Sequence, residues 1–269
     1  MRFDEAYFSL GRLDRLSYQN TFVHRLDSRV KVVATMLFIV TVISFSKYEV
    51  LPLVPFVLYP VLLLALGDLP VGFIMKKVVI VSPFAVFVGI LNPLFDRGTA
   101  MVLFGVPISA GWISFCAILL KFLLTISAAL ILIATTSFPG VCQALRRLGV
   151  PTLFVSQLLF LYRYLFVLME ETMRIIRARD LRSFGKRGLE ASAAARIIGT
   201  LFLRTVERAE RIYLAMLSRG FRGEIPLLQR PDARQGGVLF LVLLVCYLAV
   251  LRFLPVMDWL GRSLQGVAP

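Results

Sequence analysis

The sequence predicts an all-α membrane protein with five transmembrane helices and a cytoplasmic domain of one short and two long helices. Of its 269 residues, 58% are hydrophobic and only 17% are charged, and the mean hydropathy is +0.82. Soluble domains are about 45–50% apolar and about 25% charged. A soluble chain of this size could not bury so much apolar surface. The chain nevertheless carries a net charge of +14, so the position of that charge along the sequence indicates the domain organisation.

The charge is concentrated in one stretch. Residues 32–134 hold 5 basic and 3 acidic side chains, whereas residues 135–235 hold 17 basic and 8 acidic side chains and so carry +9 of the +14. We therefore divide the chain into three parts. Residues 1–134 form an N-terminal cytoplasmic segment and four transmembrane helices, residues 135–235 form the cytoplasmic helices, and residues 236–269 form a last transmembrane helix.

Five apolar runs account for the predicted spans. A membrane helix needs about 20 mostly apolar residues, and flanking lysines can extend a shorter run by reaching the interface. The predicted spans are residues 30–47, 50–67, 76–95, 111–134 and 236–257. Prolines within two of these runs are compatible with membrane helices, because neighbouring helices can satisfy the freed carbonyls.

The loops that carry basic residues predict the orientation. Lys31 precedes the first span, Lys76 and Lys77 lie between the second and third, and Arg146 and Arg147 follow the fourth. Loops on the opposite side carry one basic residue each. Since basic loops face the cytoplasm, we expect a cytoplasmic N-terminus in a multi-pass protein of the bacterial inner membrane. No cleaved signal peptide is expected.

Residues 151–169 are nearly as apolar as a span. If this segment crossed the membrane, the strongly basic block 170–235 would lie outside, which would reverse the bias of the other loops. We therefore predict a helix that begins at the membrane interface and continues into the cytoplasm, which gives five spans and not six.

The basic block is predicted to be helical. A short amphipathic helix is expected at residues 139–148, and two long helices at residues 151–184 and 189–221. Pro151 suits the first turn of a helix, and glycines terminate both long helices. Each long helix would extend about 50 Å.

The two long helices end on the same pattern, an arginine closely followed by a phenylalanine. The residues concerned are Leu181, Arg182 and Ser183 at the first end, and Ser218, Arg219 and Gly220 at the second. Arginine and glycine at a helix C-terminus are explained by the macrodipole and by capping. The repetition of the pattern favours a second explanation, in which each guanidinium contacts a carboxylate or backbone carbonyls of another protein.

Few other residues indicate a site. Lys121 lies within the fourth span, where a charge indicates a functional polar site unless it faces a cavity or pairs with a polar neighbour. His24, the single histidine, is interpreted as an interfacial polar residue, and three scattered cysteines form neither a disulfide framework nor a metal site. The chain has no Gly-rich phosphate loop, and we expect no catalytic residue, no bound cofactor and no nucleic-acid partner.

Six stretches, taken in order, resemble a known family. They are residues 24–31, 135–136, 144–151, 162–164, 177–179 and 215–223, the last reading AMLSRGFRG. In these stretches the chain resembles the transmembrane T component of energy-coupling factor (ECF) transporters, and within that group the cobalt-type subunit CbiQ.

The resemblance implies a non-catalytic subunit whose cytoplasmic coupling helices bind two CbiO-like ATPase subunits, which use ATP and Mg²⁺. The arginine motifs of the family would correspond to Arg182 and Arg219 with their neighbours. Leu181 stands where a small residue is common, which leaves Arg179 as an alternative contact. A CbiM-like membrane subunit, the S component, would recognise the cargo, with a CbiN-like subunit as a further partner.

Three alternatives remain open at this point. The chain could serve a nickel or vitamin ECF transporter, because the cargo is recognised by another subunit. It could be a membrane scaffold without a role in transport. It could also be a membrane enzyme acting on lipids, although such an enzyme needs a carboxylate cluster or a catalytic histidine.

Overall fold

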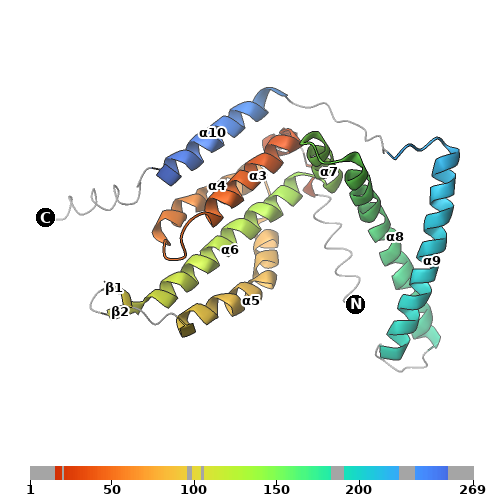
Figure 1. Ribbon diagram of the computed structural model, residues 1–269, viewed down its shortest axis with the longest axis horizontal. Helices are drawn as coiled ribbons and strands as arrows, with labels where there is room; N and C mark the ends of the chain where they lie inside the picture. Colours follow the sequence, from red (N-terminus) through yellow and green to blue (C-terminus); the bar gives the residue numbers. More distant parts are fainter. Residues whose placement is uncertain are drawn as a thin grey trace. The chain divides into compact units, whose positions relative to one another are not determined.

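The computed structural model describes residues 16–19, 21–95, 99–103, 106–182, 191–223 and 234–253. Two compact units are distinguished by their internal contacts. The first contains Asp14–Ser137 together with Gln229–Pro269, and we call it the core unit. The second contains Phe138–Leu228, and we call it the hairpin unit. Figure 1 labels the helices of both.

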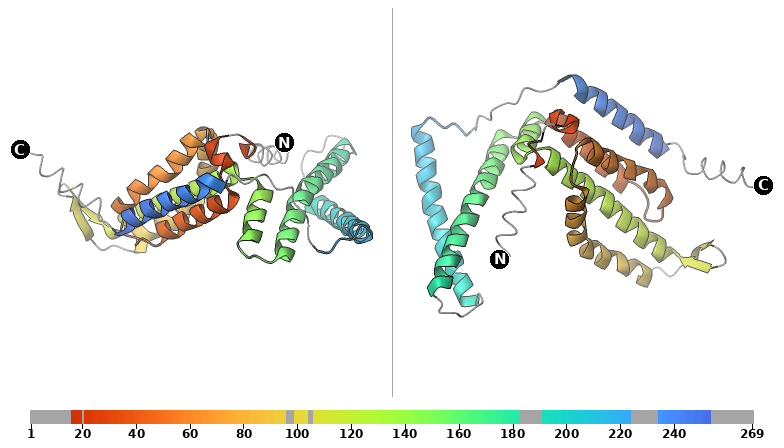
Figure 2. Two further views of the ribbon diagram at one scale, coloured as in Figure 1. Left: turned by 90° about the horizontal axis from the view of Figure 1, so that it is seen from above. Right: turned by 180° about the vertical axis from the view of Figure 1, so that it is seen from behind.

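The core unit is built around one long helix. Its elements are α2 (Phe22–Arg25), α3 (Ser28–Ile43), the 3₁₀ helix η1 (Leu51–Val57), α4 (Leu58–Leu66), α5 (Val71–Phe95), α6 (Ala110–Thr135) and α10 (Arg234–Phe253). Helix α6 contacts α3, η1, α4 and α5, and α10 contacts α3 and η1. Figure 2 shows α10 lying along α3.

Local sequence explains how several of these helices begin and bend. The Asp27 carboxylate accepts a hydrogen bond from the Arg29 backbone N–H at 2.9 Å, which caps α3 at its start. Pro52 and Pro55 lie in η1, where missing N–H groups favour 3₁₀ over α geometry. Helix α5 bends (Figures 1 and 2), and Pro83 near its middle removes one intrahelical hydrogen bond.

Aromatic side chains fill the centre of the core unit. Phe38 on α3 stacks on Tyr59 of α4 with ring centroids 4.3 Å apart, and Phe45 meets Phe56 of η1 edge to face at 5.3 Å. Phe38 and Phe56 are completely buried. Burial of such rings supplies large apolar areas and specific geometry, and it fixes α3 against the η1–α4 helix.

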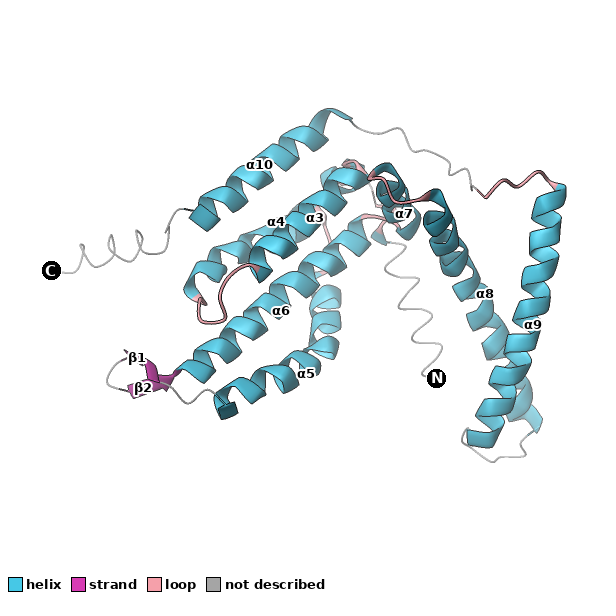
Figure 3. Cartoon of the chain, in the orientation of Figure 1, coloured by secondary structure: helices cyan, strands magenta, loops and turns pink. Residues whose placement is uncertain are grey.

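A short β-hairpin separates α5 from α6 (Figure 3). Strand β1 (Thr99–Leu103) pairs antiparallel with β2 (Val106–Ser109), and the register shifts between Thr99 and Met101. The sequence predicts a loop at residues 96–110, between the third and fourth spans. The prediction of an all-α fold class is confirmed, and the short hairpin is an addition to it that was not predicted, since the alternation of residue types is too short to stand out.

Among the residues that the structure describes, helix length and composition single out four candidate spans. These are Val71–Pro93, Ala110–Thr135, Thr152–Arg182 and Gly236–Phe253. Leu51–Leu66 is a shorter apolar helix, and α3 has 16 residues. The helices expected at residues 30–47 and 50–67 are thus present but shorter than a full span of about 20 residues. The chain is a multi-pass membrane protein. Helix α8 (Thr152–Arg182) is apolar enough to be a candidate span. Whether it crosses the membrane therefore has to be judged from the basic residues that follow it.

The hairpin unit contains α7 (Phe138–Arg147), α8 and α9 (Ala191–Ser218). The three helices predicted from the basic block are present. Helices α8 and α9 run antiparallel, as two contacts show: Ser156 Oγ donates to the Gly223 carbonyl at 3.0 Å, and Arg204 pairs with Glu171 at 2.9 Å. Residues 183–190, which join the two helices in sequence, lie outside the described part of the chain.

Candidate functional site

The end of α9 is a glycine-terminated turn. The Phe221 N–H donates to the Met216 carbonyl at 3.0 Å, and the Gly220 N–H donates to the Leu217 carbonyl at 2.9 Å. This pair of bonds is the Schellman motif. Gly220 has a φ of +79°, a left-handed conformation that costs a residue with a side chain about 1–2 kcal/mol. Arg219 is therefore the cap residue of α9.

This turn leaves the predicted motif on the surface. Ser218, Arg219 and Gly220 are all exposed. The Ser218 hydroxyl donates to the Leu214 carbonyl at 2.9 Å, so it is used within the helix. Phe221 turns back onto Phe160 of α8, with ring centroids 6.2 Å apart. The aromatic ring thus holds the turn to α8, while the adjacent arginine stays accessible to a partner.

The end of α8 is also exposed. Leu181 is 86% exposed, and Arg182 is exposed at the last helical position. Ser183, the third residue of this motif, lies outside the described residues. Arg179, the alternative contact, pairs with Asp180 at 3.4 Å, and only 24% of its side chain is exposed. On accessibility, Arg182 is the better candidate of the two arginines.

The two arginine ends are not brought together. Because α8 and α9 are antiparallel, Phe160 near the start of α8 lies beside Phe221 just past the end of α9. Arg182 lies roughly six helical turns farther along α8, or about 33 Å. The structure therefore places the two motifs at opposite ends of the same helical hairpin, so each can contact a different surface.

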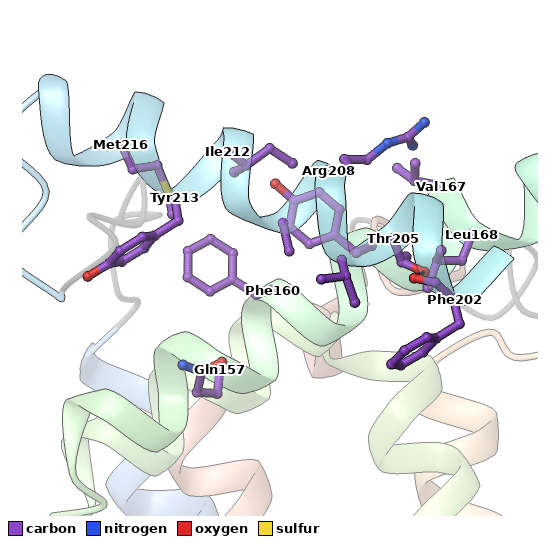
Figure 4. Close-up of a pocket in the computed structure, with 13 residues that line it drawn as sticks. Gln157, Phe160, Val167, Leu168, Phe202, Thr205, Arg208, Ile212, Tyr213 and Met216 are labelled. Carbon is purple, nitrogen blue, oxygen red and sulfur yellow. Dashed lines mark hydrogen bonds between the residues drawn. The ribbon is translucent and has the colours of Figure 1, made fainter. Parts of the chain in front are cut away.

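An apolar groove of about 460 Å³ separates the two helices of the hairpin (Figure 4). Phe160 on α8 and Tyr213 and Met216 on α9 line one part of it, and Phe202 lies at the other part. Arg208 is at its edge, 3.9 Å from the Glu171 carboxylate. The apolar faces of α8 and α9 face each other across this groove.

Lys121 is located beside the end of another helix. Its Nζ donates to the backbone carbonyl of Phe45, just past the end of α3, at 2.6 Å. Carbonyls at a helix C-terminus lack intrahelical donors and carry partial negative charge. The arginine Arg252 lies over the Phe45 ring at 4.4 Å and donates to Ser44 Oγ at 3.3 Å. Two cations of the core unit therefore converge on the end of α3.

Sequence reasoning missed the role of Lys31. This residue was used only as a basic flank of the first span, yet it is 6% exposed and its Nζ donates to the Thr135 carbonyl at 2.8 Å. The two residues are 104 positions apart, so no local signal could have revealed the pair. Nearby, burial and the positive charge of Lys31 lower the pKa of His24 below its usual value of 6.5. His24 Nδ1 lies 2.7 Å from Thr21 Oγ1.

The described residues offer no cluster of three or more His, Cys, Asp or Glu side chains that could hold a metal ion. The exposed groups at the two helix ends are a guanidinium at each end and the apolar Leu181. This arrangement suits protein docking, since guanidinium forms bidentate bonds to carboxylates.

Comparison with known proteins identifies relatives along most of the chain. The family model CbiQ, described as cobalt transport protein, matches residues 19–231. The cobalt transport protein CbiQ of Salmonella typhimurium is 26% identical over 80% of this chain and 99% of its own length. The energy-coupling factor transporter transmembrane protein EcfT of Ruminiclostridium cellulolyticum is 25% identical over 76% of this chain and 81% of its own.

An uncharacterized protein of Methanocaldococcus jannaschii is 29% identical over 85% of this chain and 81% of its own length. The resemblance seen in residues 24–31 and 215–223 thus extends over most of the sequence. The chain belongs to the CbiQ family, the transmembrane T components of energy-coupling factor transporters.

Proposed function

We propose that the chain couples two ATPase subunits to a substrate-binding membrane subunit in an ECF importer for cobalt ions. The observation that carries this proposal is the pair of exposed arginine ends on one helical hairpin, Arg182 on α8 and Arg219 on α9. Movement of the ATPases on binding ATP would displace the two ends relative to each other.

The separation of the ends supports two docking partners. The two arginines stand at opposite ends of the hairpin, about 33 Å apart along α8, so each end is free to contact a separate ATPase subunit. Each end presents one arginine, the residue best suited to bidentate contact with a carboxylate. One CbiO-like ATPase would bind at each end and use ATP and Mg²⁺, while this chain performs no catalysis and binds no cofactor.

Cobalt is proposed as the cargo because the family and one relative carry that name. A CbiM-like subunit, together with a CbiN-like subunit, would supply the metal ligands. A nickel or vitamin transporter is the alternative, since the relatives named EcfT have no cargo in their names.

The test is co-expression of the chain with CbiO-like ATPase subunits and a CbiM-like membrane subunit. We expect both ATPases to co-purify with this chain. We also expect proteoliposomes containing the complex to accumulate radioactive Co²⁺ only when ATP is supplied on the side of the membrane that carries the ATPases. Ni²⁺ and a mixture of vitamins serve as competing cargoes. A purified chain that brings down no ATPase would contradict the proposed function. Competition by Ni²⁺ would leave the coupling function in place and change only the proposed cargo from cobalt to nickel.

The proposed function requires the coupling helices to lie on the same side of the membrane as the ATPases. We place the N-terminus and residues 135–235 in the cytoplasm of a bacterium, with residues 1–134 and 236–269 holding the five spans of the inner membrane. Helix α8, although apolar enough to span, would begin at the membrane interface and continue into the cytoplasm. If α8 crossed, the exposed arginines of α9 would face the outside, against the positive-inside rule.

This orientation predicts the accessibility of α9. In a variant whose three cysteines are replaced by alanine, a single cysteine is introduced at Arg211, which is exposed on α9. We expect no labelling of Arg211→Cys by a membrane-impermeant maleimide in right-side-out vesicles, and full labelling once the vesicles are permeabilised. Lys47→Cys, in the exposed α3–η1 turn, is the control and should be labelled in both cases. Labelling of Arg211→Cys from outside would show that α8 crosses the membrane.

A further inference from the structure

Two lysines join α3 and α6 in a reciprocal way. Lys31, on the first turn of α3, donates to the carbonyl of Thr135, the last residue of α6, at 2.8 Å. Lys121, in the middle of α6, donates to the carbonyl of Phe45, just past the end of α3, at 2.6 Å. The helices are antiparallel, and each contributes an ammonium group to a backbone carbonyl at or just past the C-terminal end of the other.

The contact made by Lys31 is the more deeply buried of the two. Lys31 is 6% exposed and Thr135 is 3% exposed, whereas Lys121 is only partly buried. A buried ammonium is costly unless it is hydrogen-bonded, and the last carbonyls of a helix are favourable acceptors for a cation. Thr35 Oγ1 donates to the Lys31 carbonyl at 2.9 Å, which adds to the bonding at the start of α3. The bond therefore fixes the end of α6 to the start of α3.

The Lys31–Thr135 bond lies where the chain leaves the core unit and enters the hairpin unit. Thr135 ends α6, the central helix of the core unit, and Phe138 begins α7, the first helix of the hairpin unit. The only direct chain connection from α6 to the coupling helices therefore starts at the carbonyl that Lys31 holds. Any displacement of α7 acts first on this point of the core unit.

We propose that Lys31 is a positioning residue for coupling: by holding the end of α6 to α3, it makes the two helices move together when the hairpin unit is displaced. The proposal rests on the proposed function of the chain as the coupling subunit. Without the bond, the end of α6 could move while α3 stays in place, and part of the ATP-driven displacement would not reach the membrane helices.

The test measures uptake per ATP hydrolysed in the full complex with ATPases and membrane subunit. Lys31→Met keeps the length of the side chain and removes its charge and donors. We expect this complex to assemble and to hydrolyse ATP within about twofold of the wild type, while uptake per ATP falls about tenfold, because the loss of a hydrogen bond to a charged group loosens the end of α6 from α3. Lys76→Met, at an exposed position on α5, is the matched control and should change neither quantity. Lys31→Arg, which retains donors, should recover most of the uptake.

A second measurement covers the case in which Lys31→Met does not fold. Thr35 on α3 and Ile131 on α6 line the same small cavity as Lys31 and Thr135. In a background without native cysteines, the pair Thr35→Cys and Ile131→Cys is oxidised to a disulfide in the assembled complex. If α3 and α6 move together, transport continues after cross-linking, whereas a block by the disulfide that reduction reverses would overturn the proposal.

The outcomes also separate the two proposals. A wild-type complex without ATP-dependent uptake would contradict the function itself. A wild-type complex that transports normally, together with a Lys31→Met complex of unchanged uptake per ATP, would contradict only the role of Lys31.

Discussion

Replacement of Arg182 and Arg219 by alanine in one chain is expected to abolish ATPase association and cobalt uptake. Truncation of one partner in a buried, hydrogen-bonded charge pair costs about 2–5 kcal/mol. Each single substitution should therefore weaken association by about 30-fold or more, and the double substitution should leave no complex to purify. The measurement is a pull-down of the ATPases through a tag on this chain, followed by Co²⁺ uptake in proteoliposomes.

The matched control is Arg196→Ala. Arg196 is also an exposed arginine of α9, but it lies near the start of the helix, where its Nε donates to the Ser192 carbonyl at 3.4 Å. We expect normal association and uptake for this variant. Arg179→Ala, tested in parallel, decides which arginine of α8 makes the contact. A double variant that still binds the ATPases and transports normally would show that the helix ends are not the docking sites.

Gly220→Val is expected to weaken ATPase association without changing any charge. Gly220 has a φ of +79° within the turn that ends α9, and a β-branched residue is strongly disfavoured in this conformation. The turn would open, and Arg219 would lose its fixed position. A penalty of about 1–2 kcal/mol corresponds to an association roughly 5- to 30-fold weaker, measured by the same pull-down with circular dichroism to verify the helix content.

Two variants control for this effect. Gly220→Asn should retain most of the binding, because asparagine adopts left-handed conformations more readily than other residues with side chains. Gly199→Ala, in the interior of α9 with no neighbouring atom within 4 Å of the added carbon, should bind normally and stabilise the helix by about 1 kcal/mol. Normal binding by Gly220→Val would mean that the geometry of the turn does not matter for docking.

The candidate site could be predicted in part because its signals are local. Glycine after a basic helix, as at Gly220, indicates the end of a helix, and the arginine beside it follows in sequence. The observation that Phe221 packs on Phe160 could not be predicted in this way, since it requires the path of the chain between α8 and α9. The same limit applies to the opposite placement of Arg182 and Arg219, which depends on the antiparallel packing of the two helices.

The length of the spans shows a different limit. Apolar runs located the long core helices but not the short α2, and η1, which contains Pro52 and Pro55, is a 3₁₀ helix at the start of the second run. Helix α3 ends at Ile43, four residues before the predicted boundary. Hydropathy indicates which residues prefer lipid. It does not indicate where the backbone hydrogen bonds of a helix end. The Phe45 carbonyl left after the end of α3 is bonded by Lys121, which gives that intramembrane charge a partner that the sequence did not name.

The sequence by itself determined the membrane class, the order of the helices, the basic block at residues 135–235 and the two arginine motifs. These features follow from composition and from residues within one or two helical turns of each other. Only the tertiary structure decided that the motifs lie at opposite ends of one hairpin and that Lys31 holds the end of α6, 104 residues away. The physical reason is that a hydrogen bond to a backbone carbonyl needs no particular residue type, so the sequence of the acceptor carries no signal of the contact.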